Sequence, residues 1–416
     1  MGMAFSAVSA FEGAAAGSDA SSLPVGTVDL DGGWQLTVYD DLQAVENIWR
    51  DFQKGADCTA FQTFEWLSAW HRNIGSKNGV TPAIILARGA DGGILFILPL
   101  ARQSAYFVRE ITWLGSNLCD YNVPLLASDF SQRVDERGIR SLWDATLRLL
   151  RNIPALQFDV IRLEKMPESV RAQRNPMLAL PTTLNPSGSY ATPLADNWET
   201  FYAAKRSGST RGRDRSKRKR LAEHGQLEFV TAKTAAQARA TIEVLAAQKS
   251  AHFARLGISN LFARPGYLNF LKDVAICPDA AGLTHVSELH VGSQVAAASF
   301  ALTFGGRYYY VLSSYTDGEL SRLGPGSVHL QELLRYAIEN HFTIFDFTIG
   351  DERYKLDWCD GTSPLYDHIS TASLRGFVWV VLARLLKTVK RTIKQTPILW
   401  ACFTKLRSLL AGIRLA

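Results

Sequence analysis

The sequence predicts an α/β protein with mixed sheets, built from two similar units. The chain has 416 residues, which is long for a single hydrophobic core and suits two domains. Its apolar fraction of 47% is ordinary for a soluble globular protein. Each half is expected to hold the same order of elements: a hairpin, a strand, a helix and another strand. Two copies of one α/β unit explain this order better than two unrelated domains.

The first copy is expected within residues 34–185. Turn residues between two apolar, β-rich runs predict its hairpin, and apolar residues at helical spacing predict its long helix. Its elements are expected at 34–39 (strand), 83–89 and 94–101 (hairpin), 111–115 (strand), 142–150 (helix) and 158–164 (strand). Further helical stretches are expected between the first strand and the hairpin.

The second copy is expected within residues 186–372. Gly292 and Ser293 form a two-residue hairpin signal between apolar runs. Apolar residues then recur at i, i+3 and i+4 from Val328 to Ile338, which predicts an amphipathic helix. Its elements are expected at 285–291 and 294–304 (hairpin), 307–315 (strand), 328–338 (helix) and 343–350 (strand).

Both ends of the chain are expected to lie outside these units. Residues 1–33 are rich in Ala, Ser and Gly and have the composition of a disordered leader. Residues 373–416 are expected to form a basic amphipathic helical tail. After Asp367 the sequence has nine Lys and Arg and no acid, and without these nine the net charge of +6 becomes −3. The basic pI therefore describes the tail, and it does not indicate a body that binds nucleic acid.

The tail and the cysteines predict where the protein resides. Apolar blocks alternate with cations after residue 373, which is typical of a helix lying in the plane of an anionic membrane. Packing of the tail on the protein's own core is the alternative. The five cysteines form no CxxC pair, which argues against a zinc site or a secreted disulfide framework. We expect a cytoplasmic protein that is peripheral on the inner membrane.

A glycine-rich step precedes the second predicted long helix. Gly324, Pro325, Gly326 and Ser327 stand between a strand and that helix. Glycine lacks Cβ, so backbone N–H groups can approach an anion closely, and a helix N-terminus adds about half a positive charge. The step is therefore a candidate diphosphate cradle. An ordinary turn and cap is the alternative, because the step matches neither GxGxxG nor a Walker A loop.

This region also carries a combination of residues that is specific to a known family. The matching residues are Pro325, Gly326, Phe345, Asp346, Phe347, Gly350, Asp351, Glu352, Tyr354, Lys355 and Trp358. Their spacing resembles the signature region of the GNAT-like acetyltransferases of the CelD/BcsL family. That family is related in fold to the FemAB peptidyltransferases, which are tandem GNAT domains. The resemblance extends over roughly residues 34–372 and implies tandem GNAT-like domains.

The resemblance also implies an acyl-CoA donor, with acetyl-CoA first, and no metal. The donor's diphosphate would lie on the amides of Gly324, Gly326 and Ser327, with Arg322 beside them. Its pantetheine would lie between the 307–315 and 343–350 strands. Ordinary GNAT enzymes carry Gln or Arg where this chain has Ser321. That difference leaves open a degraded donor site or a different donor.

Acyl transfer to an amine or hydroxyl needs a group that removes a proton. For a lysine-like amine at neutral pH this costs about 4–5 kcal/mol. Asp346, Asp351 and Glu352 are candidate bases, since ligands of open α/β sheets lie beyond the strand ends. Structural hydrogen bonding is the alternative for Asp346, and a solvated turn is the alternative for the other two. Tyr354 could protonate the leaving thiolate, and Lys355 could hold a phosphate or pair with Asp351.

A basic segment lies near the start of the second copy, before its hairpin. Residues 205–220 contain nine Lys and Arg against Asp214 alone, without interleaved aromatic residues, so nucleic acid is an unlikely partner. Arg215 and Arg218 are candidates for binding an anionic acceptor, such as a nucleotide-linked sugar or a lipid-linked precursor. A solvated helix is the alternative.

The sequence therefore predicts an acyltransferase acting on an amine or hydroxyl, and the resemblance to the CelD/BcsL family implies that the acceptor is an exopolysaccharide or cell-envelope precursor. Two alternatives remain open. One is a FemAB-like transferase that uses aminoacyl-tRNA, and the other is a non-catalytic membrane-associated binding protein on the same scaffold. None of the eight histidines forms a spaced cluster, so no metal site is expected.

Overall fold

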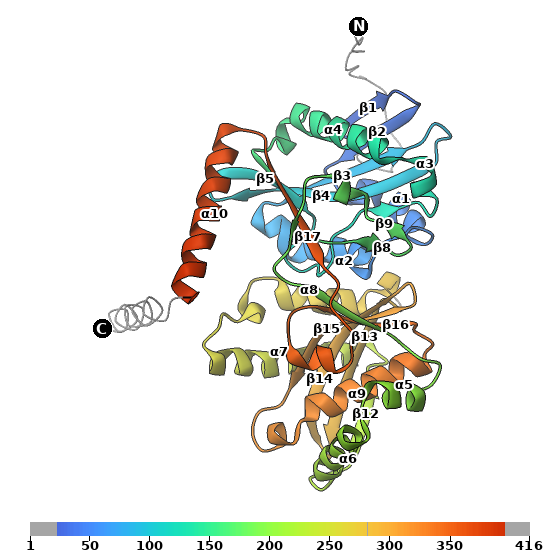
Figure 1. The fold of residues 1–416 in the computed structure, drawn as a ribbon, viewed down its shortest axis with the longest axis vertical. Coiled ribbons are helices and arrows are strands. Elements are labelled where there is room, and N and C mark those ends of the chain that lie inside the picture. Colours follow the sequence, from blue (N-terminus) through green and yellow to red (C-terminus); the bar gives the residue numbers. More distant parts are fainter. Residues whose placement is uncertain (1–22, 281, 396–416) are drawn as a thin grey trace, which may run out of the picture.

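The computed structural model describes residues 23–280 and 282–395, which form two α/β units stacked along the long axis of the molecule (Figure 1). Each unit is built on one large twisted sheet. In the first unit α4 covers one face of the sheet and α1 and α2 lie on the other.

The first unit and the segment that follows it contain these elements: β1 (Gly26–Leu30), β2 (Trp34–Tyr39), α1 (Glu46–Gln53), α2 (Phe64–Trp70), β3 (Thr81–Arg88), β4 (Ile94–Ala105), β5 (Val108–Trp113), β6 (Leu125–Leu126), α3 (Phe130–Arg133), α4 (Glu136–Asn152), β7 (Val160–Pro167), β8 (Ser169–Val170), β9 (Gln173–Arg174) and β10 (Thr183–Leu184).

The second unit and the tail contain these elements: β11 (Ser189–Pro193), α5 (Trp198–Lys205), α6 (Gly208–Ala222), β12 (Leu227–Thr231), α7 (Ala235–Leu256), α8 (Tyr267–Ile276), β13 (Thr284–Val291), β14 (Gln294–Phe304), β15 (Arg307–Tyr315), α9 (Pro325–Glu339), β16 (Ile344–Ile349), β17 (Leu365–Thr371) and α10 (Leu374–Gln395). The expected order of hairpin, strand, helix and strand occurs in both units, as β3 to β7 and as β13 to β16.

Both sheets are mixed, as the sequence predicts. The first has the strand order β1-β2-β3-β4-β5-β7-β17-β10, with β6 paired to β4, and the second has the order β11-β16-β15-β14-β13-β12. Within the described residues, β5 with β7 and β15 with β16 are the parallel pairs of these sheets. The two units therefore place one parallel pair at equivalent positions, and in each pair a long helix, α4 or α9, lies between the two strands in the chain.

One strand of the second copy belongs to the first sheet. β17 lies within the range 186–372 of the second copy, but it pairs antiparallel with β7 and β10 of the first sheet. Figure 1 shows β17 beside the strands of the first unit. β11, in contrast, pairs antiparallel with β16 of the second sheet and so stays within its own range. The first sheet is thus completed by a strand that follows the whole second unit in the chain.

An apolar core joins the two units. The Trp66 ring of α2 and the Phe270 ring of α8 meet edge to face with centroids 4.7 Å apart. The cluster around them takes buried residues from both units, among them Trp49, Phe61 and Phe300. Since burying apolar surface is the main stabilising term in folding, the units are expected to unfold together.

The ends of the chain differ in part from the expectation. Residues 26–30 were expected in a disordered leader, but they form β1 and pair antiparallel with β2. The turn signal Asp31-Gly32 between them was present in the sequence, and Gly32 has φ 86. Residues 1–22 lie outside the described residues. The tail forms α10 as far as Gln395, and residues 396–416 also lie outside.

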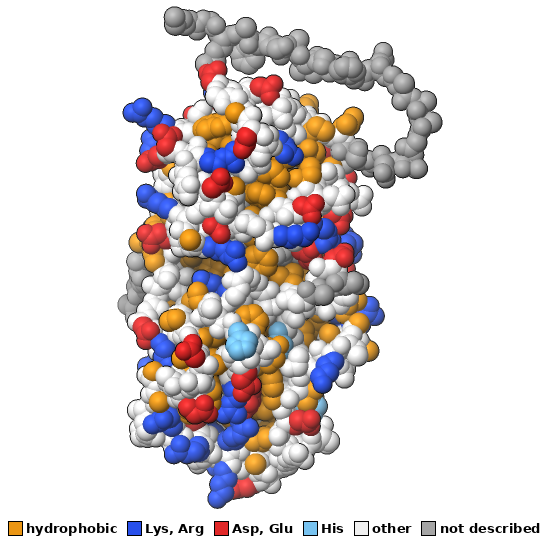
Figure 2. All heavy atoms as spheres, turned by 90° about the vertical axis from the view of Figure 1, so that its right-hand side faces the viewer, with side chains coloured by type: hydrophobic (Ala, Val, Ile, Leu, Met, Phe, Trp, Pro, Cys, Tyr) orange, Lys and Arg blue, Asp and Glu red, His pale blue; other side chains and the backbone are white. Residues whose placement is uncertain are grey.

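Surface charge on the body of the protein is mixed. On the face in Figure 2, Lys and Arg side chains lie among Asp and Glu side chains over both units. In the part of the chain that the structure describes, no helix has both the length and the apolar character needed to cross a membrane.

Two buried histidines connect α9 to the sheet beneath it. The His285 ring of β13 stacks on the Tyr336 ring of α9 with centroids 3.9 Å apart, and its Nδ1 lies 2.8 Å from the Tyr308 hydroxyl. Nε2 of His329 in α9 lies 3.1 Å from the Ser287 hydroxyl of β13. Burial lowers the pKa of His285 to about 4 and the pKa of His329 to about 3. Both imidazoles are therefore neutral in the folded protein at neutral pH.

Acidification is expected to destabilise the second unit. Unfolded histidine titrates near pH 6.5, so below this pH the unfolded chain binds protons that the folded chain does not. The free energy of unfolding should fall between about pH 6.5 and pH 4, by up to about 1.4 kcal/mol per pH unit for each histidine. Urea denaturation at several pH values measures this slope. The double variant His285→Gln/His329→Gln should reduce this pH dependence, whereas the control His224→Gln, at an exposed site, should leave it unchanged. If the double variant keeps the full pH dependence, the two histidines are not its cause.

Candidate functional site

The parallel strands β15 and β16 separate near their middle. Their pairing is confined to Arg307–Tyr309 with Ile344–Asp346. Beyond this point β15 remains paired with β14, and β16 remains paired with β11. The facing edges of the two strands therefore carry backbone groups that are not paired with each other.

Both strands are irregular where they separate. Opposite β14, the pairing of β15 shifts so that Tyr310 and Val311 form a bulge. A bulge leaves one residue out of the ladder and is common beside active sites. In β16, Thr348 has φ 59, which is strained for a β-branched residue. In the first unit, β4 and β5 pair without a shift from Leu100 to Ala105, so this bulge belongs to the second unit.

The N-terminus of helix α9 lies beside β15 and has features that favour binding of an anion. Its N-cap is Gly324 at φ 75, no side chain caps it, and its first turn contains no acid. The equivalent helix of the first unit, α4, has Asp135 as its cap, with the side chain accepting from the Gly138 N–H, followed by Glu136. Since helix N-termini attract negative charge, an anion is favoured at α9 and repelled at α4.

The structure leaves fewer free amides at this start than the sequence suggested. The Gly324 N–H donates to the Ser321 carbonyl at 3.2 Å, and the Ser327 N–H donates to the Gly324 carbonyl at 3.1 Å. Proline has no N–H, so the Gly326 N–H is the one left for a ligand. A Cβ at Gly326 would lie 3.3 Å from Cδ1 of Tyr315, which shows how little space this position has.

Cations flank the start of α9. A Cβ at Gly324 would meet Cδ of Lys217 at 3.6 Å, so the Lys217 side chain from α6 lies against this turn. Its nearest acid, Asp214, is 4.0 Å from Nζ. Arg322 is exposed and forms no ion pair with a described residue. Sequence reasoning placed Arg322 at this site and missed Lys217, because the sequence does not reveal which face of α6 meets α9.

Arg215 and Arg218 line a different space. They border a cavity of about 180 Å³ between α5, α6 and α9, together with Trp198 and Tyr202. Arg218 forms an ion pair with Glu332, whereas Arg215 has no ion-pair partner among the described residues. The structure therefore does not bring these two arginines to the start of α9.

Asp346 is fully buried where β15 and β16 separate. Its carboxylate accepts from the Tyr121 hydroxyl at 2.7 Å, the Arg307 guanidinium at 2.6 Å and the Thr348 N–H at 2.8 Å. Tyr121 belongs to the first unit, so this carboxylate also links the units. With donors on both oxygens, the Asp346 carboxylate has the contacts expected of the structural alternative.

The structure brings together the other predicted residues after β16. The Tyr190 hydroxyl donates to Asp351 at 3.2 Å. Lys355 is buried, donates from Nζ to the Ile349 carbonyl at 2.9 Å, and pairs with Glu352 at 3.0 Å. The acid paired with Lys355 is thus Glu352, and Asp351 is held by Tyr190.

Tyr354 lies on the α9 side of the sheet. Its ring meets the Phe347 ring edge to face, with centroids 6.3 Å apart. Burial is the main cause that raises the pKa of Tyr354, and Tyr310 and Glu352 add to it. The phenol therefore keeps its proton at neutral pH and can act as a donor.

Two titratable groups near this strand end were missed by sequence reasoning. Asp120, in the loop after β5, lies near Thr348 and Lys355, and burial raises its pKa to about 6, with Lys165 opposing the shift. Lys249 of α7 lies near Glu352; burial lowers the pKa of Lys249, and Glu352 raises it. Only the docking of distant segments places these groups here, although a carboxylate just beyond a strand was a signal for Asp120.

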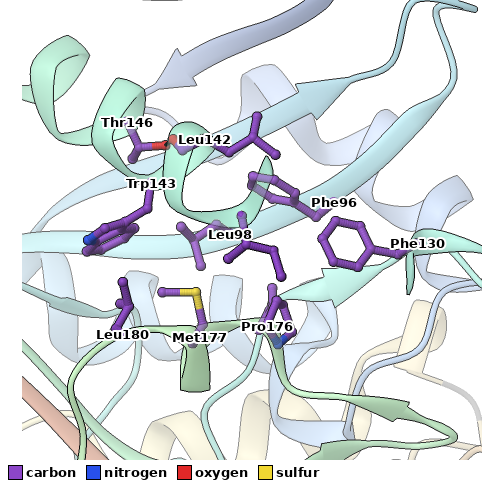
Figure 3. A pocket seen from close by; sticks show the side chains of 11 residues that line it. Phe96, Leu98, Phe130, Leu142, Trp143, Thr146, Pro176, Met177 and Leu180 are labelled. Carbon is purple, nitrogen blue, oxygen red and sulfur yellow. Dashed lines mark hydrogen bonds between the residues drawn. The ribbon is translucent and has the colours of Figure 1, made fainter. Parts of the chain in front are cut away.

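A further cavity is lined by no charged side chain. It measures about 30 Å³ and lies between β4, α4 and the turn Pro176–Ala179 (Figure 3). Apolar side chains line it, and the Thr146 hydroxyl there donates to the Leu142 carbonyl at 2.8 Å. Within residues 23–280 and 282–395, no group of three or more His, Cys, Asp or Glu is placed to hold a metal ion.

Comparisons with known proteins agree with this geometry. The acetyltransferase (GNAT) domain family matches residues 208–356, from α6 to the residues after β16. The crystal structure of FemX matches with a TM-score of 0.53 and 13% identity, covering 78% of this chain and 96% of that chain. The chain has a tandem GNAT-like fold. A conserved protein of unknown function from Bacteroides thetaiotaomicron shares it, with a TM-score of 0.51, 12% identity, and coverage of 80% of this chain and 99% of that chain. No curated protein matches the chain.

Removing one donor from Asp346 is expected to destabilise the protein. Tyr121→Phe leaves a buried carboxylate short of a hydrogen bond, which costs about 1–3 kcal/mol. Urea denaturation measures the loss. Tyr366→Phe is the matched control, because the Tyr366 hydroxyl makes no hydrogen bond to a described residue. Equal stability of Tyr121→Phe and the unmodified protein would show that this link is dispensable.

Proposed function

We propose that the protein is an acyltransferase that moves an acyl group, acetyl in the first instance, from acyl-CoA to an amine or hydroxyl. The observation that supports this most is the difference between the two GNAT-like units. In both units the parallel strands pair over only three residues, but the second unit adds a bulge in β15 and a helix start capped by glycine and free of acids. The first unit has Asp135 and Glu136 at the equivalent helix start, so a single donor site is proposed.

The donor would bind from the α9 side. Its diphosphate would meet the Gly326 N–H, the Ser327 hydroxyl, Lys217 and Arg322. Its pantetheine would extend between β15 and β16, where amide groups of the arm can pair with strand edges that lack a partner. The unpaired amide of the β15 bulge would donate to the thioester carbonyl as negative charge develops on its oxygen.

The acceptor would bind from the side of the first unit. There Asp120 is the proposed base, since a carboxyl with a pKa of about 6 is largely ionised at neutral pH and still accepts a proton. The acceptor nitrogen or oxygen attacks the acyl carbon, the carbon–sulfur bond breaks, and Tyr354 protonates the departing thiolate. Glu352 and Asp351, near the same strand end, would orient the acceptor, and Lys355 would hold Glu352 in place.

The proposed acceptor and cellular location follow from the resemblance to the CelD/BcsL family. On that basis the acceptor is an exopolysaccharide or cell-envelope precursor, and the protein works in the cytoplasm at the inner membrane. The cavity lined by Arg215 and Arg218 suits an anionic portion of such a precursor.

A FemAB-like transfer from aminoacyl-tRNA is the second candidate. The basic helix α6 favours it, because Arg211, Arg213, Arg215, Lys219 and Arg220 form no ion pair with a described residue. The fold match to FemX fits this candidate as well. Titration calorimetry with acetyl-CoA and with charged tRNA separates the two candidates, and binding of neither favours a non-catalytic protein.

Filling the proposed diphosphate site should abolish donor binding. In Gly326→Val the side chain would occupy the space beside the free N–H and Tyr315, so affinity for acetyl-CoA should fall by roughly a hundredfold or more. Titration calorimetry measures this, with urea denaturation as a check on folding. Gly208→Val is the control, since Gly208 also stands in the first turn of a helix and a Cβ there meets nothing within 4 Å. Undiminished affinity in Gly326→Val would place the donor elsewhere.

Removing the proposed base should change the pH profile of the reaction. A base with a pKa of about 6 is active above this pH, so release of CoA from acetyl-CoA should rise with pH around this midpoint. Asp120→Asn should lower the rate of CoA release by roughly 10²–10⁴-fold and abolish the increase of this rate with pH. A thiol assay of CoA release from pH 5 to 8 measures both, and Asp129→Asn on the exposed surface is the control. If the rate of CoA release by Asp120→Asn still rises with pH around pH 6, Asp120 is not the base.

A further inference from the structure

Helix α10 packs on the first unit by only one face. Val380 is buried against Val108 and Val160, and Gly376 lies directly against the Asp159 backbone. Another face of α10 is apolar and exposed. Its residues are Leu374 (79% exposed), Phe377 (56%), Val378 (44%), Val381 (38%), Leu382 (46%) and Leu385 (55%). Their i, i+3, i+4 spacing places them on one side of the helix.

The turn between β4 and β5 extends this apolar face. Tyr106 is 95% exposed and Phe107 is 51% exposed at its tip. An open groove of about 490 Å³ lies between the tip and the helix, lined by Phe107, Leu374 and Val378 among others. The six exposed residues of α10 together with Tyr106 and Phe107 are called the α10–tip surface below.

The start of α10 is held firmly to the first sheet. The Asp159 carboxylate accepts from the Ser373 hydroxyl at 2.8 Å, the Arg375 guanidinium at 2.9 Å and the Arg109 N–H at 2.9 Å. Because Arg109 stands in β5 directly after the tip, one carboxylate positions both parts of the α10–tip surface. The two parts therefore form one rigid surface.

The charge of the tail indicates which kind of partner covers the α10–tip surface. A contiguous exposed apolar patch marks an interaction site, and a soluble partner or a membrane could cover it. The chain after Asp367 contains nine Lys and Arg and no acid, whereas the body in Figure 2 mixes acids with cations. An apolar helix face in a segment of this composition is complementary to a lipid surface with anionic headgroups.

We propose that the α10–tip surface inserts into the headgroup region of an anionic membrane, with the β4–β5 tip as a second insertion point beside the helix. This extends the membrane association proposed above and does not depend on acyl transfer. A single helix in the membrane plane leaves a protein free to roll about the helix axis. A second insertion point removes that freedom and fixes the orientation of both units relative to the lipid.

Vesicle flotation with the full chain tests this inference. The probes are vesicles of phosphatidylcholine alone and vesicles with equal parts phosphatidylcholine and phosphatidylglycerol. One variant changes the tip, Tyr106→Ser/Phe107→Ser, and another changes the helix, Phe377→Ser/Leu385→Ser. The control, Leu256→Ser/Ile258→Ser, alters residues of similar exposure (56% and 51%) at the end of α7. Circular dichroism confirms that each variant is folded.

We expect the unmodified protein and the control to float with the anionic vesicles and to be released by salt. Each surface variant should partition roughly tenfold or more weakly, because apolar side chains no longer enter the membrane.

A tip variant that binds as tightly as the unmodified protein overturns the second insertion point alone. An unmodified protein that binds neither vesicle overturns membrane association itself. A lipid-independent dimer, broken by the helix variant and without vesicle binding, would assign the surface to a second copy of the chain. CoA affinity is measured separately, so none of these outcomes bears on the donor site.

Discussion

The site depends on a carboxylate buried where two parallel strands separate. A buried charge without partners costs several kcal/mol, so Asp346 requires the Arg307 guanidinium and the Tyr121 hydroxyl. Arg307 is in β15 and Tyr121 is in the first unit, so satisfying this one charge fixes three segments together. The separation of β15 from β16 and the docking of the first unit beside it are therefore coupled.

The coupling explains why the two GNAT-like units occur as a pair. The first sheet is completed by β17, which follows the second unit in the chain, and an apolar core runs between α2 and α8. The start of α4 in the first unit lacks the features proposed for the donor site, yet this unit supplies Tyr121 and Asp120 beside β16. Its contribution to the proposed reaction is thus to build the acceptor side of a site whose donor side belongs to the second unit.

Local signals in the sequence predicted most of the fold. The Gly292-Ser293 turn and the apolar spacing of α9 identify their elements without ambiguity, because both depend on the nearest neighbours in the chain. The glycine-rich step was placed at the start of α9, but its free amides could be counted only once the turn was known. Three features depend on tertiary packing, which a single sequence does not record: β17 in the first sheet, Lys217 at Gly324 and Asp120 at Thr348. For Asp346, the pattern showed a carboxylate in a strand, and only the contacts showed that its oxygens are occupied.

The central claim is that the second unit alone binds the donor, with its diphosphate at the start of α9 and its pantetheine between β15 and β16. A crystal structure of the protein with bound CoA tests this most directly. The account predicts diphosphate density at Gly326, beside Lys217, and an extended arm that ends near the β15 bulge. Density for CoA at the start of α4 in the first unit, or β15 and β16 closed on each other with CoA bound elsewhere, would contradict it.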